Sequence, residues 1–393
     1  GNARDIWKTV EGEDVQAHLK ELAGQLRSHP RVKVYTGATI DRIDGFVGNY
    51  RAIFHVRGAD KPVEFDHGAV IVATGAEYRT PVEYRYGESE AIITQRELEE
   101  RIAKHMSLGD GSVVMIQCVG SREPERPWCS RICCAEAVKN AIALKEADPD
   151  RPVYVLYREI RTYGMREEYY RRARELGVVF IRFDVADKPR VEIENGNPVV
   201  TVRDPVLDRE LRLRPGLLVL SSGLVPRNGS GELAKMLKVP LNADGFFLEA
   251  HMKLRPVDFA TEGVFMAGLC HFPKFIDESV AQARAAAGRA ATVLARDQLE
   301  AEATVARVNP ERCTACRMCE TLCAYRAIEV KVINETFGTE AAVVNEALCK
   351  GCGACAANCR CSAIDIFGFT NENIAREIAA LLDEPPRRVP ADR

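Results

Sequence analysis

The stretch that decides the fold is SVVMIQCVGSREPERPWCSRICCAEAVKNA, residues 112–141. It begins as an apolar strand and ends as a helix, and an α/β nucleotide-binding unit carries its glycine-rich phosphate loop between two such elements. This chain has Cys118, Cys129, Cys133 and Cys134 there instead. The stretch therefore predicts an α/β unit whose connecting loop carries metal or redox chemistry rather than a phosphate cradle.

Strands and helices alternate around this stretch. The runs PVYVLYREI and VVFIRF indicate strands, and helices are expected near 131–146 and 165–176. Such alternation is typical of a parallel sheet with right-handed crossovers. We therefore expect an α/β fold with an inserted, nucleotide-binding-like domain at 107–224. Elsewhere, periodicity predicts strands within 32–56 and helices at 12–28, 278–296 and 371–383.

Residues 308–330 and 344–366 form an internal repeat with a period of 36 residues. Each copy has the spacing Cys-x2-Cys-x2-Cys-x3-Cys of two-cluster ferredoxins, in which the fourth cysteine binds the cluster of the other copy. A zinc domain is the alternative, because paired Cys-x2-Cys also binds zinc, but eight cysteines without His favour iron. We therefore expect a ferredoxin domain at 301–370, followed at 371–393 by a helix and a disordered tail. It would hold one [4Fe–4S] cluster on Cys313, Cys316, Cys319 and Cys359, and another on Cys349, Cys352, Cys355 and Cys323.

The composition excludes several classes of protein. The chain has 393 residues, a formal net charge of −3 and fourteen cysteines. This charge balance argues against a nucleic-acid partner. The apolar runs have strand length and the N-terminus has no secretory pattern, so we expect a cytoplasmic protein without a membrane span. In such a chain cysteines favour metal or redox chemistry over disulfides.

Three interpretations of the four cysteines at 118–134 are open. The preferred one is a third [4Fe–4S] cluster, whose negative charge the start of the predicted helix would favour. The second is a thiol–disulfide pair, although flavin disulfide reductases use Cys-x2-Cys and this loop does not. The third is four buried structural cysteines. Cys270 and Cys361 are interpreted as structural.

Two short segments, VIVATG ending at Gly75 and GVFMAG ending at Gly268, are typical of flavin-facing strand ends. Each also fits an ordinary core strand, but their order around the inserted domain favours an FAD-binding-type domain made of 1–106 and 225–300. The fingerprint G-x-G-x-x-G, which binds a dinucleotide pyrophosphate, occurs neither before residue 30 nor near 118. We therefore expect a partial FAD domain and no direct binding of NAD(P)H.

Several long motifs resemble those of the A-type subunit of heterodisulfide reductases. They are IQCVGSR, WCSRICCAEAVKNA, YREIRTYGMREEYYRRARELGVVFIRFD and FPKFIDESVAQARAAAG, followed by the double cluster motif. The resemblance covers residues 1 to about 370. It implies a thioredoxin-reductase-like, two-dinucleotide-binding FAD core with ferredoxin modules, and a role in flavin-based electron bifurcation. Family members carry their FAD fingerprint upstream of the region that matches Gly1, so FAD is expected to be shared with an upstream segment or a partner chain.

The resemblance also assigns residues. It implies that the four cysteines at 118–134 hold a non-standard [4Fe–4S] cluster and that Lys139, as the catalytic residue, lies near the flavin N5 edge. A cation there would stabilise reduced flavin, whereas the alternative is an ordinary helix-surface lysine. The helix opened by DESVAQA is expected to direct N–H groups at the flavin, with Asp277 or Ser279 as its cap. The expected flavin contacts are Thr74, Gly75, Lys139, Gly268, Lys274 and Val280.

The leading hypothesis is an electron-transferring iron–sulfur flavoprotein subunit of a heterodisulfide-reductase-like complex, an oxidoreductase of anaerobic metabolism. Its cofactors would be three [4Fe–4S] clusters and FAD. Its partners would be the other subunits and an iron–sulfur protein or a hydrogenase or dehydrogenase module. The alternatives are a stand-alone NAD(P)H-linked flavin disulfide reductase and a flavin-free iron–sulfur relay subunit. Flavin content and titration with NAD(P)H distinguish the three.

Overall fold

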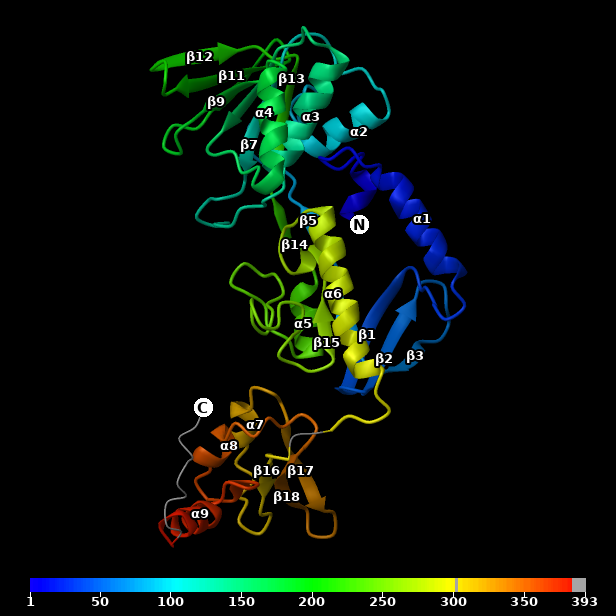
Figure 1. The fold of residues 1–393 in the computed structure, drawn as a ribbon, viewed down its shortest axis with the longest axis vertical. Helices are drawn as coiled ribbons and strands as arrows, with labels where there is room; N and C mark the ends of the chain where they lie inside the picture. Colours follow the sequence, from blue (N-terminus) through cyan, green and yellow to red (C-terminus); the bar gives the residue numbers. More distant parts are fainter. Residues whose placement is uncertain (301–302, 384–393) are drawn as a thin grey trace, which may run out of the picture.

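The computed structural model describes residues 1–300 and 303–383 of the chain. Three parts follow one another along the long axis of the molecule (Figure 1). A sheet domain lies at one end, a region built around the long helix α6 lies in the middle, and a small C-terminal module lies at the other end. Within the described residues, no helix is both long and apolar enough to cross a bilayer.

The sheet domain confirms the α/β expectation. Its five strands have the order β6-β13-β7-β8-β9, and every pair in the sheet is parallel. Strand β6 belongs to this sheet and helix α2 packs against it. The domain therefore begins before residue 107, the boundary that the sequence suggested. The elements are β6 (Ile92–Thr94), α2 (Gln95–Ala103), β7 (Val113–Val119), α3 (Cys133–Ala147), β8 (Val153–Tyr157), η2 (Gly164–Arg166), α4 (Glu167–Glu175), β9 (Val179–Arg182) and β13 (Leu217–Ser222).

The core of this domain explains why α3 lies where it does. All seven residues of β7 are buried, as expected for the central strand of a parallel sheet. Ala137 and Ala141 of α3 are fully buried against the sheet, and their small side chains let the helix approach closely. The opposite face is covered by an antiparallel sheet that was not predicted, formed by β10 (Arg190–Glu194), β11 (Asn197–Asp204) and β12 (Arg209–Leu213).

The middle part is assembled from both sides of the inserted domain. Strand β4 pairs in parallel with β15, and β5 pairs with β14, so segments 146 to 194 residues apart lie side by side. Residues 33–37, expected within a strand, lie outside any element, and β1 begins at Ala38. The elements are η1 (Asn2–Asp5), α1 (Val15–Ser28), β1 (Ala38–Phe46), β2 (Asn49–Val56), β3 (Val63–His67), β4 (Val70–Val72), β5 (Ala76–Tyr78), β14 (Leu224–Pro226), α5 (Ser230–Leu237), β15 (Val264–Met266), η3 (Gly268–Cys270) and α6 (Ile276–Leu294).

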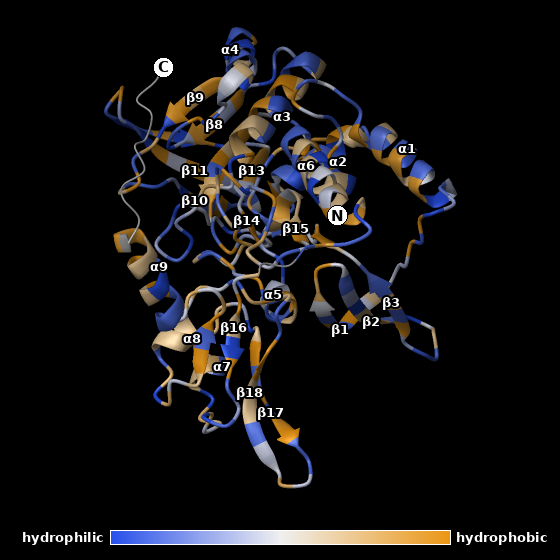
Figure 2. Cartoon of the chain, turned by 60° about the horizontal axis from the view of Figure 1, so that its bottom comes forward, coloured by the Kyte–Doolittle hydropathy of each residue, from blue (hydrophilic) through white to orange (hydrophobic). Residues whose placement is uncertain are grey.

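The strand pairs of the C-terminal module follow the sequence repeat. Strand β16 pairs with β19 and β17 pairs with β18, and a shift of 36 residues converts the pair Val308–Ile364 into Val344–Ile328. The β17–β18 hairpin extends beyond the repeat and projects from the module (Figure 2). The elements are β16 (Ala306–Val308), α7 (Met318–Leu322), β17 (Ile328–Asn334), β18 (Thr339–Val344), α8 (Ala354–Ala357), β19 (Ile364–Ile366) and α9 (Asn371–Asp383).

Helix α9 has the bounds that its periodicity predicted. Its apolar residues Ile374, Ile378, Leu381 and Leu382 are exposed by 44% to 80%, so they do not pack back on the module. The tail that the sequence suggested, at 384–393, lies outside the described residues.

Candidate functional site: clustered thiols and two strand ends

Four cysteines gather where β7 ends and α3 begins. Cys118 lies near the end of β7 with a left-handed φ of 61°, and Cys133 and Cys134 are the first two residues of α3. Cys129 comes from the loop between them. Cys118, Cys133 and Cys134 are buried, whereas Cys129 is half-buried. The first turn of α3 therefore presents two thiols and its free N–H groups to the same small region.

The acidities of these thiols show that they interact. Burial raises the pKa of Cys118 to about 11, and the neighbouring Cys134 and Cys129 add to this rise. The hydrogen bond to Cys134 and burial raise the pKa of Cys133 well above its ordinary value. The same bond lowers the pKa of Cys134 to about 7, helped by the backbone N–H of Arg161 and by the charges of Arg161 and Arg122. The four thiols therefore form one electrostatic unit.

Arginines surround this unit and fit a negatively charged group. Arg122 donates to Glu159 at 3.2 Å through Nη2, while its Nη1 is buried and has no partner among the residues that the structure describes. Arg161 donates to the same carboxylate at 2.9 Å. An iron–sulfur cluster on four thiolates is anionic, so an unpartnered guanidinium N–H and a helix N-terminus both favour it. The residues present thus fit a cluster.

The hydrogen bonds to cysteine sulfur atoms are equivalent in the two halves of the C-terminal module, as the strand pairs are. The N–H groups of Ala327 and Ala363 donate to Cys323 and Cys359, each at 3.2 Å. The N–H of Ala342 donates to Cys313 at 3.5 Å, and the equivalent donor for Cys349 is Ala306 at 3.3 Å. Such hydrogen bonds stabilise thiolates and tune cluster potentials. The two halves therefore provide equivalent surroundings for two groups of cysteines.

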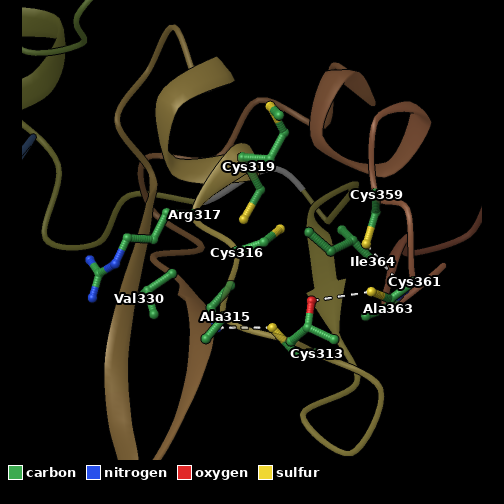
Figure 3. A pocket seen from close by; sticks show the side chains of 13 residues that line it. Cys313, Ala315, Cys316, Arg317, Cys319, Val330, Cys359, Cys361, Ala363 and Ile364 are labelled. Atoms are coloured by element: carbon green, nitrogen blue, oxygen red, sulfur yellow. Dashed lines mark hydrogen bonds between the residues drawn. The ribbon is translucent and has the colours of Figure 1, made fainter.

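One of these groups lines a pocket in the module. Figure 3 shows Cys313, Cys316 and Cys319 on one side of it and Cys359, from the second repeat, on the other. This is the set that the sequence repeat predicts for one cluster. In residues 1–300 and 303–383 no three metal-ligating side chains converge on a single ion. A cubane cluster spreads its thiolates over four irons and needs a wider space than one ion does.

Three cysteines of the second set, Cys349, Cys352 and Cys355, lie near one another. Burial raises the pKa of Cys355, and the nearby Cys349 and Cys352 add to the rise. Cys323 is the equivalent of Cys359 in the other half of the repeat. The strand pairs and the N–H to sulfur hydrogen bonds of the two halves are related by the same shift of 36 residues.

Most of the predicted flavin contacts lie together at the ends of β4 and β15. Gly75 and Gly268 have left-handed φ values of 79° and 80°, and added Cβ atoms would meet open space. The Oγ1 atom of Thr74 is buried and has no hydrogen-bond partner within residues 1–300 and 303–383. Lys274 donates to the carbonyl oxygens of Gly268 and Phe272 at 2.8 Å, and burial lowers its pKa to about 8. These residues at the strand ends, with the orphaned hydroxyl of Thr74 and the open space at both glycines, fit part of a flavin.

Helix α6 begins beside these strand ends, and Val280 lies in its first turns. The expectation that Asp277 or Ser279 caps the helix is wrong. The carboxylate of Glu278 accepts the N–H of Phe275 at 2.8 Å, and the hydroxyl of Ser279 donates to the Phe275 carbonyl.

Lys139 lies in a separate group of buried charges. Its ammonium donates to the carboxylate of Glu99 and, at 2.9 Å, to the carbonyl of Lys8. The lysine side chain is 11% exposed and that of Glu99 is 1% exposed. Lys139 is therefore not the helix-surface lysine of the alternative interpretation. None of its hydrogen bonds in the described residues reaches Thr74, Gly75, Gly268 or Lys274.

Arginine side chains contact the loop after β7 at the place where a phosphate-binding loop would leave room for a pyrophosphate. A Cβ atom added at Gly120 would lie 2.1 Å from Nη1 of Arg79, and Arg79 itself pairs with Glu83. The Gly120 carbonyl accepts from Arg126 at 2.7 Å. These contacts are consistent with the prediction that no pyrophosphate binds here.

Sequence reasoning missed two polar networks. Burial, followed by the charge of Glu99, raises the pKa of Glu136 to about 8, and this carboxyl also contacts Tyr78. Arg131 links the four-cysteine loop to α6 through Glu278 at 2.9 Å. The only signal in the sequence was the placement of charged residues within apolar elements.

The chain resembles characterised proteins over most of its length, although no model of a known protein family matches it. It is 40% identical over 289 residues to the second A-type iron–sulfur subunit of CoB–CoM heterodisulfide reductase from Methanopyrus kandleri, covering 68% of this chain and 43% of that protein. It is 39% identical over 343 residues to the A-type subunit of H2:CoB–CoM heterodisulfide,ferredoxin reductase from Methanothermobacter marburgensis, covering 82% and 50%. Thioredoxin reductase of T. acidophilum aligns in structure with a TM-score of 0.49 and 14% identity, covering 75% and 86%. The chain spans about half the length of the curated relatives it matches.

Proposed function

Because the chain belongs to the family of A-type heterodisulfide reductase subunits, we propose that it is an electron-transferring iron–sulfur subunit of a heterodisulfide-reductase-like complex. The observation that carries the proposal is the cavity where three cysteines of one repeat face Cys359 of the other. This crossing of the fourth cysteine is the ligand pattern of two-cluster ferredoxins.

Three groups of thiols would hold the clusters. An iron–sulfur cluster supplies one-electron transfer, at a potential set by its charge, its hydrogen bonds and its exposure. The chain supplies the ligands, the N–H groups of Ala306, Ala327, Ala342 and Ala363, and the arginines around Cys134. The sets are Cys118, Cys129, Cys133 and Cys134; Cys313, Cys316, Cys319 and Cys359; and Cys349, Cys352, Cys355 and Cys323.

The ends of β4 and β15 are the proposed place of the flavin ring. Thr74 would donate or accept a hydrogen bond there, the glycines 75 and 268 would let the ring approach the backbone, and the start of α6 near Val280 would offer its positive end. A flavin supplies two-electron chemistry, which one-electron carriers divide, and this division is the bifurcation that we propose for the complex. The pyrophosphate half of FAD would be held by an upstream segment or a partner chain.

The experiment that tests the function is the cofactor content of the anaerobically purified chain. Three clusters correspond to about twelve irons and as many sulfides per chain. A value near eight irons would remove the cluster at 118–134 and revive the dithiol interpretation. A chain without iron, or with zinc in its place, would refute the function. FAD should be scarce on the isolated chain, and stoichiometric FAD would show that this chain holds the pyrophosphate by itself.

A partner is expected at the C-terminal end. The exposed apolar residues of α9 and the ferredoxin-like module lie at the end of the molecule farthest from the sheet domain (Figure 1). We propose that electrons enter or leave here through a partner iron–sulfur protein.

A further inference from the structure

The two halves of the C-terminal module differ in one sulfur atom. The 36-residue repeat matches the first cysteine of each half, the fourth cysteine, the strand register and the N–H to sulfur bonds. Two residues after the fourth cysteine, however, one half has Cys361 and the other has Tyr325. The second half of the repeat therefore carries a fifth cysteine that has no counterpart.

This fifth cysteine lines the same cavity as the four predicted ligands (Figure 3). Its Sγ atom lies 3.3 Å from the hydroxyl of Thr314, which follows Cys313 on the facing loop. The intervening backbone turns tightly, because Ser362 has a left-handed φ of 47° and donates its N–H to the Cys359 carbonyl at 3.0 Å. The turn holds Cys359 and Cys361 on the same wall of the cavity.

We propose that Cys361 is a reserve ligand of this site, able to take the iron that Cys359 binds. The inference rests on the proposed function, since it requires a cluster in the cavity. In the exchange the Cys361 thiol loses its proton as its sulfur binds iron, and the Cys359 thiolate leaves and takes up a proton. No electron is gained or lost. The thiolate, rather than the thiol, is the ligand in both states.

The repeat supplies a matched control for the test. Cys359→Ala and Cys323→Ala remove equivalent ligands, but only the first leaves another cysteine within the same cavity. Iron and sulfide would be measured on the full chain after anaerobic purification. We expect Cys359→Ala to keep about twelve irons per chain, and Cys323→Ala and the double variant Cys359→Ala/Cys361→Ala to keep about eight.

Other results would overturn the inference. One is an iron loss in Cys359→Ala as large as that in Cys323→Ala, and another is full iron in the double variant. An oxidised three-iron EPR signal in Cys359→Ala would show that the fourth iron found no thiolate. These outcomes leave the proposed function intact when the unaltered chain holds about twelve irons, whereas an unaltered chain without iron would defeat the function itself.

A second measurement covers the case in which Cys359→Ala does not fold, as judged by circular dichroism. The variant Cys359→Ser keeps the size of the side chain but offers a poorer ligand. Cys361 should then be protected from iodoacetamide in Cys359→Ser and modified in the unaltered chain. Equal modification of Cys361 in both proteins would refute the exchange.

Discussion

The buried pair of Lys139 and Glu99 allows a prediction that separates structural from catalytic roles. Lys139→Met removes the cation but keeps a side chain of similar length. It leaves the carboxylate of Glu99, which is 1% exposed, with one hydrogen bond from the described part of the chain, donated by the N–H of Trp7 at 3.1 Å. An ion pair broken in this way leaves an uncompensated buried charge. We expect the free energy of unfolding to fall by about 3–5 kcal/mol.

The pH dependence of this loss follows from Glu136. Burial and the charge of Glu99 hold the pKa of Glu136 at about 8, above its ordinary 4.5, and Lys139 opposes this rise. A folded pKa above the unfolded one means that the folded state binds more protons between pH 4.5 and 8. Stability is therefore lost as pH rises through that window. Without Lys139 this loss of stability with rising pH becomes larger. The free energies of unfolding of Lys139→Met and the unaltered protein should therefore differ less at pH 5.5 than at pH 8.

Urea denaturation followed by circular dichroism measures both effects. The control is Lys104→Met, which breaks an exposed pair with Glu100, whose side chains are 62% and 56% exposed. This control should cost no more than about 1 kcal/mol. The double variant Glu99→Gln/Lys139→Met should recover part of the loss, because no buried charge is left unpaired. A loss below about 1 kcal/mol for Lys139→Met would refute the buried pair and return Lys139 to a role at the flavin alone.

Four further predictions test the site. Cys133→Ser should lower iron by about four atoms per chain, whereas Cys270→Ser, at a buried cysteine outside the cluster sets, should leave iron unchanged; equal losses would contradict the assignment. A chain ending at Arg296 should keep about four irons and lose electron exchange with its partner iron–sulfur protein, so unchanged exchange would exclude this route. NADPH without a partner should not bleach the flavin of an FAD-loaded preparation, and rapid bleaching would show a direct site. Burial lowers the pKa of Lys274 from 10.5 in the unfolded chain to about 8 in the folded protein, so the free energy of unfolding should rise as pH rises from 8 to 10.5. This rise should be smaller for Lys274→Met. The same pH dependence of unfolding in both proteins would contradict the prediction.

Local patterns in the sequence predicted much of the fold. The alternation of strands and helices is encoded by neighbouring residues, so the parallel sheet and the bounds of α9 were accessible. The antiparallel sheet β10–β12 was missed, although its strands are regular. The limits of the inserted domain were also shifted, since β6 joins the sheet by pairing with β13, more than 100 residues later in the chain. Pairing over such a separation leaves no local signal.

The sequence by itself predicted which cysteines belong together, because a repeat with fixed spacing encodes a loop of fixed shape. Only the tertiary structure decided what surrounds them. It turned Lys139 toward Glu99, 40 residues earlier, and it brought Cys361 to within hydrogen-bonding distance of Thr314, 47 residues earlier. It also left Nη1 of Arg122 buried beside the thiols, with no partner in the part of the chain that the structure describes. The physical reason is that spacing along the chain sets backbone geometry over a few residues, whereas burial, charge pairing and cavities arise where distant elements cross.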